Sequence, residues 1–223
     1  MRPGSTFTQD IARTGPIEVT PYETLIPMSP RRLLFTSSAF ALLVLLVIGL
    51  LQLGSSSPTL LPSRLTPAQM RASLAGSPEP LAAIHAQADQ LLGGGLGAVR
   101  ARLATLKGHP TVINRWASWC EPCRAEFGVF QAASVARGRE VAFLGIDSGD
   151  SSRSRPEAFL RSFPVSYPSY FDPSEQVGQA ITESSFTPVT VFIDSRGRQY
   201  VRQGPYPSVA KLEADIARYA LDG

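Results

Sequence analysis

The sequence predicts an α/β fold in which a mixed sheet carries helices on both faces. Two observations indicate this arrangement. Over residues 110–181, short apolar runs typical of buried parallel strands alternate with segments of helical period. Two further strand patterns, 189–193 and 199–202, are joined by a turn around Gly197, which predicts an antiparallel hairpin. Parallel units followed by a hairpin make the sheet mixed.

Local sequence patterns predict the individual strands and helices. The predicted strands are 110–116, 141–146, 189–193 and 199–202, and the predicted helices are 122–136, 158–163, 172–181 and one that follows Ser208. Ser154 and Glu157 fit a capping box before the second helix. Asp172 and Pro173 fit the start of the third, and Ser208 fits the N-cap of the last.

Residues 66–107 are predicted to be a helical extension that packs on a domain formed by residues 108–223. Thr66 and Pro67 fit the N-cap and first position of a short helix. Apolar residues then recur at helical spacing in two more stripes, each closed by glycine. The predicted helices are 67–75, 78–92 and 96–107.

A membrane anchor is predicted near the N-terminus. Arg31 and Arg32 open the segment 31–53, and residues 33–53 carry no charge. At about 1.5 Å per residue, a helix of this length crosses a hydrocarbon core of about 30 Å. No positive charge follows before Arg64, so the positive-inside rule predicts a cytoplasmic N-terminus and an exported remainder. The bilayer is thus an expected partner of residues 33–53.

The segments flanking the anchor have the composition of unstructured chain. Residues 1–30 are rich in proline and predict a disordered cytoplasmic tail, and residues 54–65 predict a tether. A cleaved signal peptide is the alternative to the anchor. The apolar run exceeds the about 7–15 residues of a signal-peptide core, and no A-x-A-like site follows it. We therefore expect a single-pass plasma-membrane protein with an extracytoplasmic domain.

Composition and cysteine count exclude several classes of function. The net charge is only +3, and no run of Lys and Arg is interleaved with aromatic residues, so nucleic-acid binding is not expected. Both cysteines of the chain lie in one C-x-x-C motif, Cys120 and Cys123. A zinc site would need further ligands, and His85 and His109 lie far from the motif in sequence. No metal or other cofactor is expected.

The stretch 116–126 carries the chemistry. Cys120 follows an apolar strand and precedes a helix, where unpaired N–H groups and the helix dipole favour a thiolate. Cys123 lies one turn inside the helix, shielded and placed to attack a mixed disulfide on Cys120. Two thiols at this spacing can close a disulfide and so carry two electrons.

Trp116, Trp119, Cys120 and Cys123 form the pattern W-x-x-W-C-x-x-C, which is much more specific than C-x-x-C alone. With it, residues 108–223 resemble the membrane-anchored thioredoxin-like TlpA/ResA family. The resemblance implies a thioredoxin-like fold and thiol–disulfide oxidoreductase activity. It also implies that Cys120 is the attacking thiol and Cys123 the resolving thiol, in agreement with their positions on the predicted helix.

The resemblance assigns the surroundings of the thiols as well. Thr187 and Pro188 match the family's cis-proline pair, which faces the thiols and offers backbone hydrogen bonds to a substrate segment. Glu126 matches a buried acidic residue that relays protons. Substrate contacts are expected from Trp119, Glu121, Pro122, Thr187 and Pro188.

We state a separate hypothesis for each of two carboxylates in the stretch 116–126. Glu126 would accept the proton when Cys123 reacts, and the alternative is a carboxylate on the helix surface. Glu121, next to Cys120, opposes the helix dipole, which should raise the pKa of the thiol and favour reduction of substrates. Arg115 and Arg124 would offset this effect if they pointed at the sulfur.

The expected function is reduction of disulfides in exported proteins. By the resemblance, apocytochrome c is a possible substrate, and electrons would come from a membrane-embedded reductase of the DsbD/CcdA type. A disulfide-forming oxidase is the alternative within the class. From another class, a non-catalytic assembly or metal-chaperone module is the alternative, although copper chaperones on this fold use C-x-x-x-C with a distant His.

Overall fold

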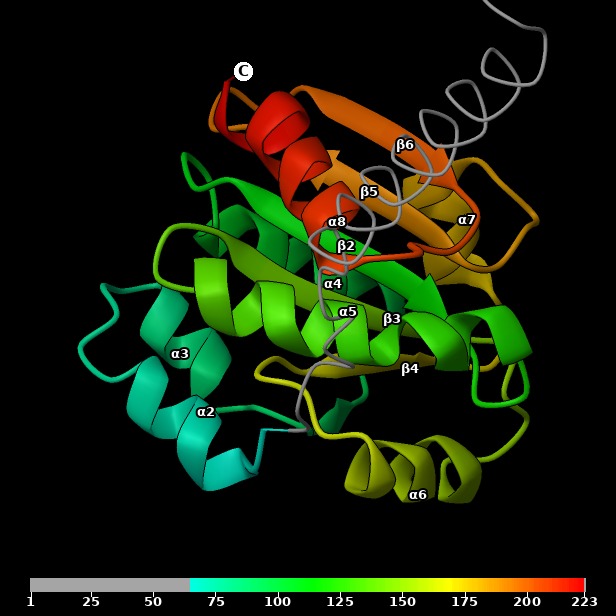
Figure 1. Ribbon diagram of the computed structural model, residues 1–223. Helices are drawn as coiled ribbons and strands as arrows, with labels where there is room; N and C mark the ends of the chain where they lie inside the picture. The colour runs from blue at the N-terminus through cyan, green and yellow to red at the C-terminus, as the bar shows by residue number, and fades with distance from the viewer. Residues whose placement is uncertain (1–64, 223) are drawn as a thin grey trace, which may run out of the picture. The chain divides into compact units, whose positions relative to one another are not determined.

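The computed structural model describes residues 65–222, which belong to one unit of the chain, Leu60–Gly223 (Figure 1). The predicted tail 1–30, the anchor 31–53 and all but the last residue of the tether 54–65 lie outside the described residues. Among residues 65–222, no helix combines the length and the apolar character needed to cross a membrane.

Six strands form one mixed sheet in the order β1-β4-β3-β2-β5-β6. The strands are β1 Leu91–Leu92, β2 Thr111–Trp116, β3 Ala142–Ser148, β4 Ser169–Asp172, β5 Val189–Ile193 and β6 Gln199–Gln203. The first four in chain order pair in parallel, whereas β5 and β6 run antiparallel to their neighbours. The predicted mixed sheet with a terminal hairpin is confirmed. Every residue of β2 and β3 is buried, as expected for central strands.

Helices cover both faces of the sheet, as predicted (Figure 1). They are α2 Pro67–Ser73, α3 Leu81–His85, α4 Gly95–Thr105, α5 Glu121–Arg137, α6 Ser154–Ser162, α7 Gln176–Thr182 and α8 Val209–Ile216, which continues into the π-helical η1 Ala217–Leu221. Helices α5 and α8 pack against each other, and so do α4 and α7. Ser208 caps α8 by accepting the N–H of Lys211, so this predicted cap is confirmed.

The segment 66–107 is not only a helical extension. Its first helix is confirmed, because Thr66 and Gln69 form a capping box. The long helix expected over 78–92 is wrong: α3 ends at His85, and β1 then joins the sheet beside β4. Asp89 adopts a positive φ of 60°, which breaks a helix. Leu91 and Leu92 then pair with the distant strand β4 instead of forming further helical turns.

Two other boundaries also differ from the prediction. Asp172 does not start a helix but ends the unpredicted strand β4, and its carboxylate accepts hydrogen bonds from Ser148 Oγ and from the N–H of Gly178. The prediction of a capping box at Ser154 is wrong. Helix α6 already begins at this residue, and Glu157 pairs with Arg153 at 3.1 Å. In both places, another contact uses a polar side chain that a cap was expected to use: a tertiary one at Asp172 and a local ion pair at Glu157.

An aromatic cluster joins β2, α5 and α6. The ring centroid of Trp116 lies 4.8 Å from that of Phe127 and 5.5 Å from that of Phe159, and the Trp116 indole N–H donates to Ser169 Oγ at 3.1 Å. The edge-to-face packing of Trp116 and Phe127 stabilises the fold beyond the burial of their apolar surface. The cluster fixes the end of β2, from which the cysteine loop departs.

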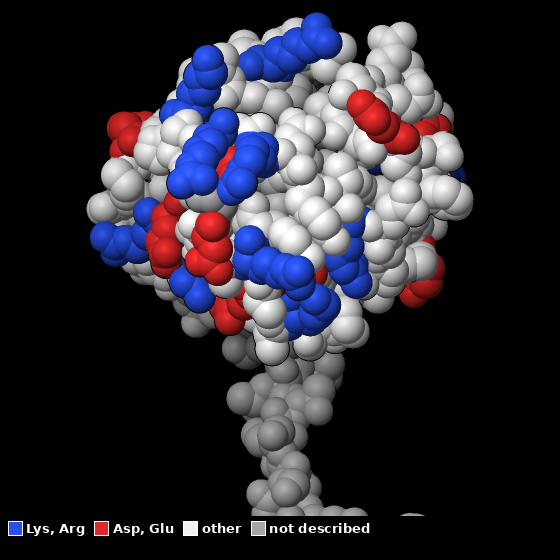
Figure 2. All heavy atoms as spheres, turned by 90° about the horizontal axis from the view of Figure 1, so that it is seen from above, with Lys and Arg blue, Asp and Glu red and all other residues white. Residues whose placement is uncertain are grey.

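The charged surface is mixed in sign. Figure 2 shows basic and acidic side chains interspersed on the face that it presents, with uncharged surface between them. Opposite charges at short spacing largely cancel beyond a Debye length of about 10 Å. On this face of the described domain, no extended field of one sign develops.

Replacing Phe127 by Ala should lower the free energy of unfolding by about 3–5 kcal/mol, because it opens a cavity in the aromatic cluster. Chemical denaturation of the purified full-length chain measures this loss. Phe186→Ala is the control, since this ring is 66% exposed and its loss should cost less than about 0.5 kcal/mol. Equal losses of unfolding free energy in the two variants would contradict the inference that the aromatic cluster stabilises the fold.

Candidate active site

The two cysteines lie where β2 ends and α5 begins. Cys120 is the N-cap of α5, and its Sγ accepts the N–H of Cys123 at 3.2 Å. Pro122 occupies the first turn, where it needs no hydrogen bond for its nitrogen. The sulfurs form a disulfide with an S–S distance of 2.03 Å. The helix dipole and the Cys123 N–H therefore both point at the sulfur that would carry charge as a thiolate.

The disulfide is nearly enclosed, yet its rim is apolar and open. Cys120 is 5% exposed and Cys123 is fully buried. Trp119 and Phe186, which directly precede Cys120 and Thr187 in the chain, are 60% and 66% exposed. Large apolar side chains at a surface are typical of a docking site for another molecule.

The loop before β5 faces the attacking cysteine. The Thr187–Pro188 peptide bond is cis, as the resemblance implied. Cys120 Sγ lies 3.8 Å from the carbonyl oxygen of Thr187. Of the residues expected to contact substrate, Trp119, Glu121 and Pro122 are exposed, Thr187 is half-buried and Pro188 is buried. The fold thus brings together two segments more than sixty residues apart in the sequence.

A groove of about 440 Å³ adjoins this rim. Ser118 and Trp119 line it on the side of the cysteine loop, and α6 lines the other side. Arg124 contributes from α5, where its guanidinium lies 5.5 Å from the ring centroid of Phe159. Arg124 therefore does not point at the Cys120 sulfur, and it pairs only loosely with Glu121, at 3.9 Å.

Glu126 is completely buried on α5, so the alternative of a surface carboxylate is wrong. Its Oε2 accepts the N–H of Tyr206 at 2.9 Å, whereas Oε1 has no hydrogen-bond partner. Burial raises the pKa of Glu126 to about 7, and the Tyr206 N–H, Asn114 and Arg202 oppose that rise. Asn114 lowers the pKa of Glu126 from close range, although neither polar atom of its amide makes a hydrogen bond of normal geometry. A carboxyl group with this pKa can exchange protons at neutral pH.

The chain is similar to known proteins. The Redoxin family matches residues 87–216, more than half of the chain. The chain belongs to the redoxin family. It is 30% identical over 100 residues to the thiol-disulfide oxidoreductase ResA of Bacillus subtilis, an alignment that covers 44% of this chain and 55% of that protein. It is 30% identical over 122 residues to the thiol:disulfide interchange protein DsbE of Allochromatium vinosum, covering 51% and 64%.

A solved structure is also similar to this redoxin. It is that of a putative thiol:disulfide interchange protein DsbE from Chlorobium tepidum, with a TM-score of 0.48 and 23% identity over 52% of this chain and 84% of that one. The expected resemblance to the ResA family is confirmed by the ResA relatives. The chain nevertheless spans only a little more than half of the length of the first of these relatives.

Arg115 organises the cis-proline loop of this redoxin from the other face of β2. It is fully buried, pairs with Glu175 at 2.6 Å and donates to the backbone carbonyl of Ser184. A Cβ on Gly178 would collide with its Nε, so only glycine leaves room for the side chain. The sequence showed Arg115 as a charge among apolar neighbours but not its partners. It therefore does not offset the charge of Glu121 at the sulfur.

Asp147, which the sequence analysis did not single out, lies opposite Trp116 in the register of β2 and β3. It is fully buried, and neither carboxyl oxygen has a hydrogen-bond partner. Burial is the main cause that raises the pKa of Asp147 to about 9, and the neighbouring side chain of Asp150 adds to the rise. Asp150 itself accepts the N–H and the hydroxyl of Ser118, both at 2.7 Å, and so anchors the cysteine loop.

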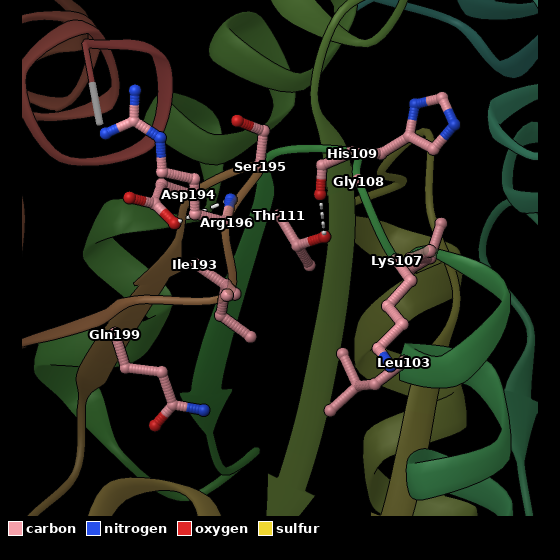
Figure 3. Close-up of a pocket in the computed structure, with 12 residues that line it drawn as sticks. Leu103, Lys107, Gly108, His109, Thr111, Ile193, Asp194, Ser195, Arg196 and Gln199 are labelled. Atoms are coloured by element: carbon pink, nitrogen blue, oxygen red, sulfur yellow. Dashed lines mark hydrogen bonds between the residues drawn. The ribbon is translucent and has the colours of Figure 1, made fainter.

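A second cavity, of about 520 Å³, lies at the opposite end of β2 (Figure 3). The end of α4, the start of β2 and the turn between β5 and β6 line it. Figure 3 shows the side chains of Lys107, His109 and Arg196 spread apart around it rather than converging. This cavity contains no thiol and lies away from the disulfide, so we assign it no part in the chemistry.

Asp147→Asn should stabilise the domain at alkaline pH. The folded state keeps a proton on Asp147 up to pH about 9, whereas an unfolded Asp loses it near pH 4. Stability therefore falls as the pH rises between these values. An Asn, which resembles the protonated acid, removes this dependence and should raise the free energy of unfolding at pH 8 by about 2–4 kcal/mol.

Denaturation of the full-length chain at pH 5 and pH 8 measures the effect. Asp150→Asn is the contrast, because it weakens the two hydrogen bonds to Ser118 and should lower stability at both pH values. If Asp147→Asn destabilised the chain at pH 8 as Asp150→Asn does, Asp147 would be ionised in the folded protein.

Proposed function

We propose that this chain is a thiol–disulfide oxidoreductase that exchanges disulfides with exported proteins. The observation that carries the proposal is the Cys120–Cys123 disulfide at the start of α5, facing a cis-proline loop in a redoxin domain. Names of the relatives that the chain resembles, such as thiol-disulfide oxidoreductase ResA, support the same chemistry.

The exchange begins with the reduced pair. The Cys120 thiolate attacks one sulfur of a substrate disulfide, forms a mixed disulfide and displaces the other substrate sulfur as a thiolate. Cys123 then passes its proton to the Glu126 carboxylate and attacks Cys120 Sγ. The Cys120–Cys123 disulfide forms, and the second substrate sulfur leaves as a thiolate. Two electrons pass to the substrate, so a dithiol reductant must restore the pair before the next cycle.

The direction of exchange is proposed to be reduction. The Glu121 carboxylate beside Cys120 disfavours the thiolate, which makes the dithiol a stronger reductant. Apocytochrome c is a proposed substrate, and a membrane-embedded reductase of the DsbD/CcdA type is the proposed electron donor. A measured reduction potential near −120 mV, typical of a strong oxidant, would instead indicate a disulfide-forming oxidase.

The domain is proposed to act outside the cytoplasm while tethered to the plasma membrane. Residues 33–53 would form the anchor, with residues 1–30 cytoplasmic and everything after Leu53 exported. The support is the uncharged apolar run that follows Arg31 and Arg32. The site-residue assignment stays as expected from the sequence: Cys120, Cys123 and Glu126 react, and Trp119, Glu121, Pro122, Thr187 and Pro188 contact substrate.

Cys123→Ser should trap mixed disulfides with substrate proteins, because the resolving sulfur is gone while Cys120 still attacks. Non-reducing electrophoresis followed by mass spectrometry of cells that express the variant detects them. Cys120→Ser is the matched control and should trap none. The exchange mechanism is wrong if Cys123→Ser traps nothing either.

Glu126→Gln tests the proton acceptor. In the unmodified chain, the rate of release of the mixed disulfide should rise as the pH increases through about 7, because only ionised Glu126 accepts a proton. The Gln variant should lose this rise and react about 10²-fold more slowly at pH 8. Glu157→Gln, on the surface of α6, is the control for a change of charge alone. An unaltered pH profile in the Glu126 variant would rule out the relay.

A further inference from the structure

Arg202 is held in place by several contacts near Glu126. It lies on β6, opposite Thr190 of β5, which in turn lies opposite Asn114 of β2. This register places Arg202 and Asn114 on the same face of the sheet, the face that α5 covers. The guanidinium donates to the carbonyl oxygens of Gly204 at 2.6 Å and of Pro205 at 3.3 Å.

Tyr206 and Asp215 complete the cluster. The Arg202 guanidinium carbon lies 4.1 Å from the ring centroid of Tyr206. Its Nε lies 3.7 Å from Asp215 Oδ2, and the Tyr206 hydroxyl donates to the same oxygen at 2.9 Å. Arg202 is thus fixed by two backbone carbonyls, one ring and one carboxylate. A side chain with this many contacts has little rotamer freedom to lose.

The cluster acts on Glu126 in two ways. The backbone N–H of Tyr206 donates to Glu126 Oε2 at 2.9 Å. The charge of Arg202 adds an attraction for the ionised carboxylate, and both lower the pKa of Glu126 against the effect of burial. Without them, a fully buried carboxyl group would keep its proton at neutral pH.

We propose that Arg202, fixed by Tyr206 and Asp215, is a positioning residue that keeps Glu126 in the ionised form able to accept the proton of Cys123. This inference rests on the proposed function, in which Glu126 is that acceptor. It gives β6, the loop before α8 and the end of α8 a part in the chemistry. Arg202 does not itself take up or release a proton in the exchange.

The other groups around Glu126 do not replace Arg202. Lys211 lies 2.6 Å from Asp215, and Arg202 rather than Lys211 is the cation whose charge lowers the pKa of Glu126. Tyr167 stays neutral, because burial raises the pKa of its hydroxyl well above its usual value. Asn114 also lowers the pKa of Glu126 from close range, but neither Asn114 nor Thr190 carries a charge that could replace that of Arg202.

Arg202→Gln removes the charge and keeps a hydrogen-bond donor. The pKa of Glu126 should rise by roughly 0.5–1 pH unit in this variant, and Arg202→Lys should restore most of the difference. Carboxyl ¹³C NMR titration of the full-length chain measures the pKa directly, with Glu126→Gln to assign the signal. The pH at which mixed-disulfide release reaches half its maximal rate should move by the same amount.

Arg198→Gln is the matched control. Arg198 lies on the same hairpin and pairs with Asp194 at 2.6 Å, at the turn before β6. It should leave the pKa of Glu126 and the release profile unchanged. Because the NMR titration does not require exchange activity, it tests Arg202 even if the proposed function is wrong. The inference is overturned if Arg202→Gln leaves the pKa of Glu126 unchanged, or shifts it no more than Arg198→Gln does.

Discussion

One hydrogen bond links the fold of this redoxin to its reactivity: the N–H of Cys123 donates to the sulfur of Cys120. A helix start needs an acceptor for its unpaired N–H groups, and here the acceptor is the reactive atom. The stability of α5 and the charge of the sulfur are therefore coupled. The remaining features of the site either fix this junction, as the Trp116 cluster and Asp150 do, or handle the proton that the second sulfur loses.

The central strand β2 divides these tasks between its two faces. Asn114 points to the face where α5 carries Glu126, and the next residue, Arg115, holds the carbonyl of Ser184 on the opposite face. Polar side chains inside a central strand are costly unless they are paired. Arg115 is paired by Glu175, and this pairing supports the loop that carries Pro188. The proton acceptor and the cis-proline loop are thus positioned by neighbouring residues of a single strand.

The sequence predicted best the parts of the fold that depend on local pattern. The strand before Cys120, the long helix after it and the final hairpin have strong periodicity and clear turn residues. Strands β1 and β4 were missed because two- and four-residue strands form by pairing with distant partners. Asp172 was misread for a related reason, since its carboxylate bonds Ser148 rather than a local cap. The burial of Glu126 followed from a family resemblance, whereas its contact with Tyr206, 80 residues away, had no local signal.

The buried carboxyl groups bear on how charge moves in the proposed cycle. Burial keeps Asp147 protonated at neutral pH, whereas Glu126, with a pKa of about 7, can carry a negative charge there, and Arg202 favours that charge. When Cys123 gives its proton to Glu126, the interior keeps one negative charge, now on sulfur. Attack on Cys120 transfers that charge to the departing substrate thiolate, which carries it into water. Removing a charge from a medium of low dielectric constant is favourable. Formation of the internal disulfide therefore moves one negative charge from the interior to the solvent, which favours release of reduced substrate over its recapture.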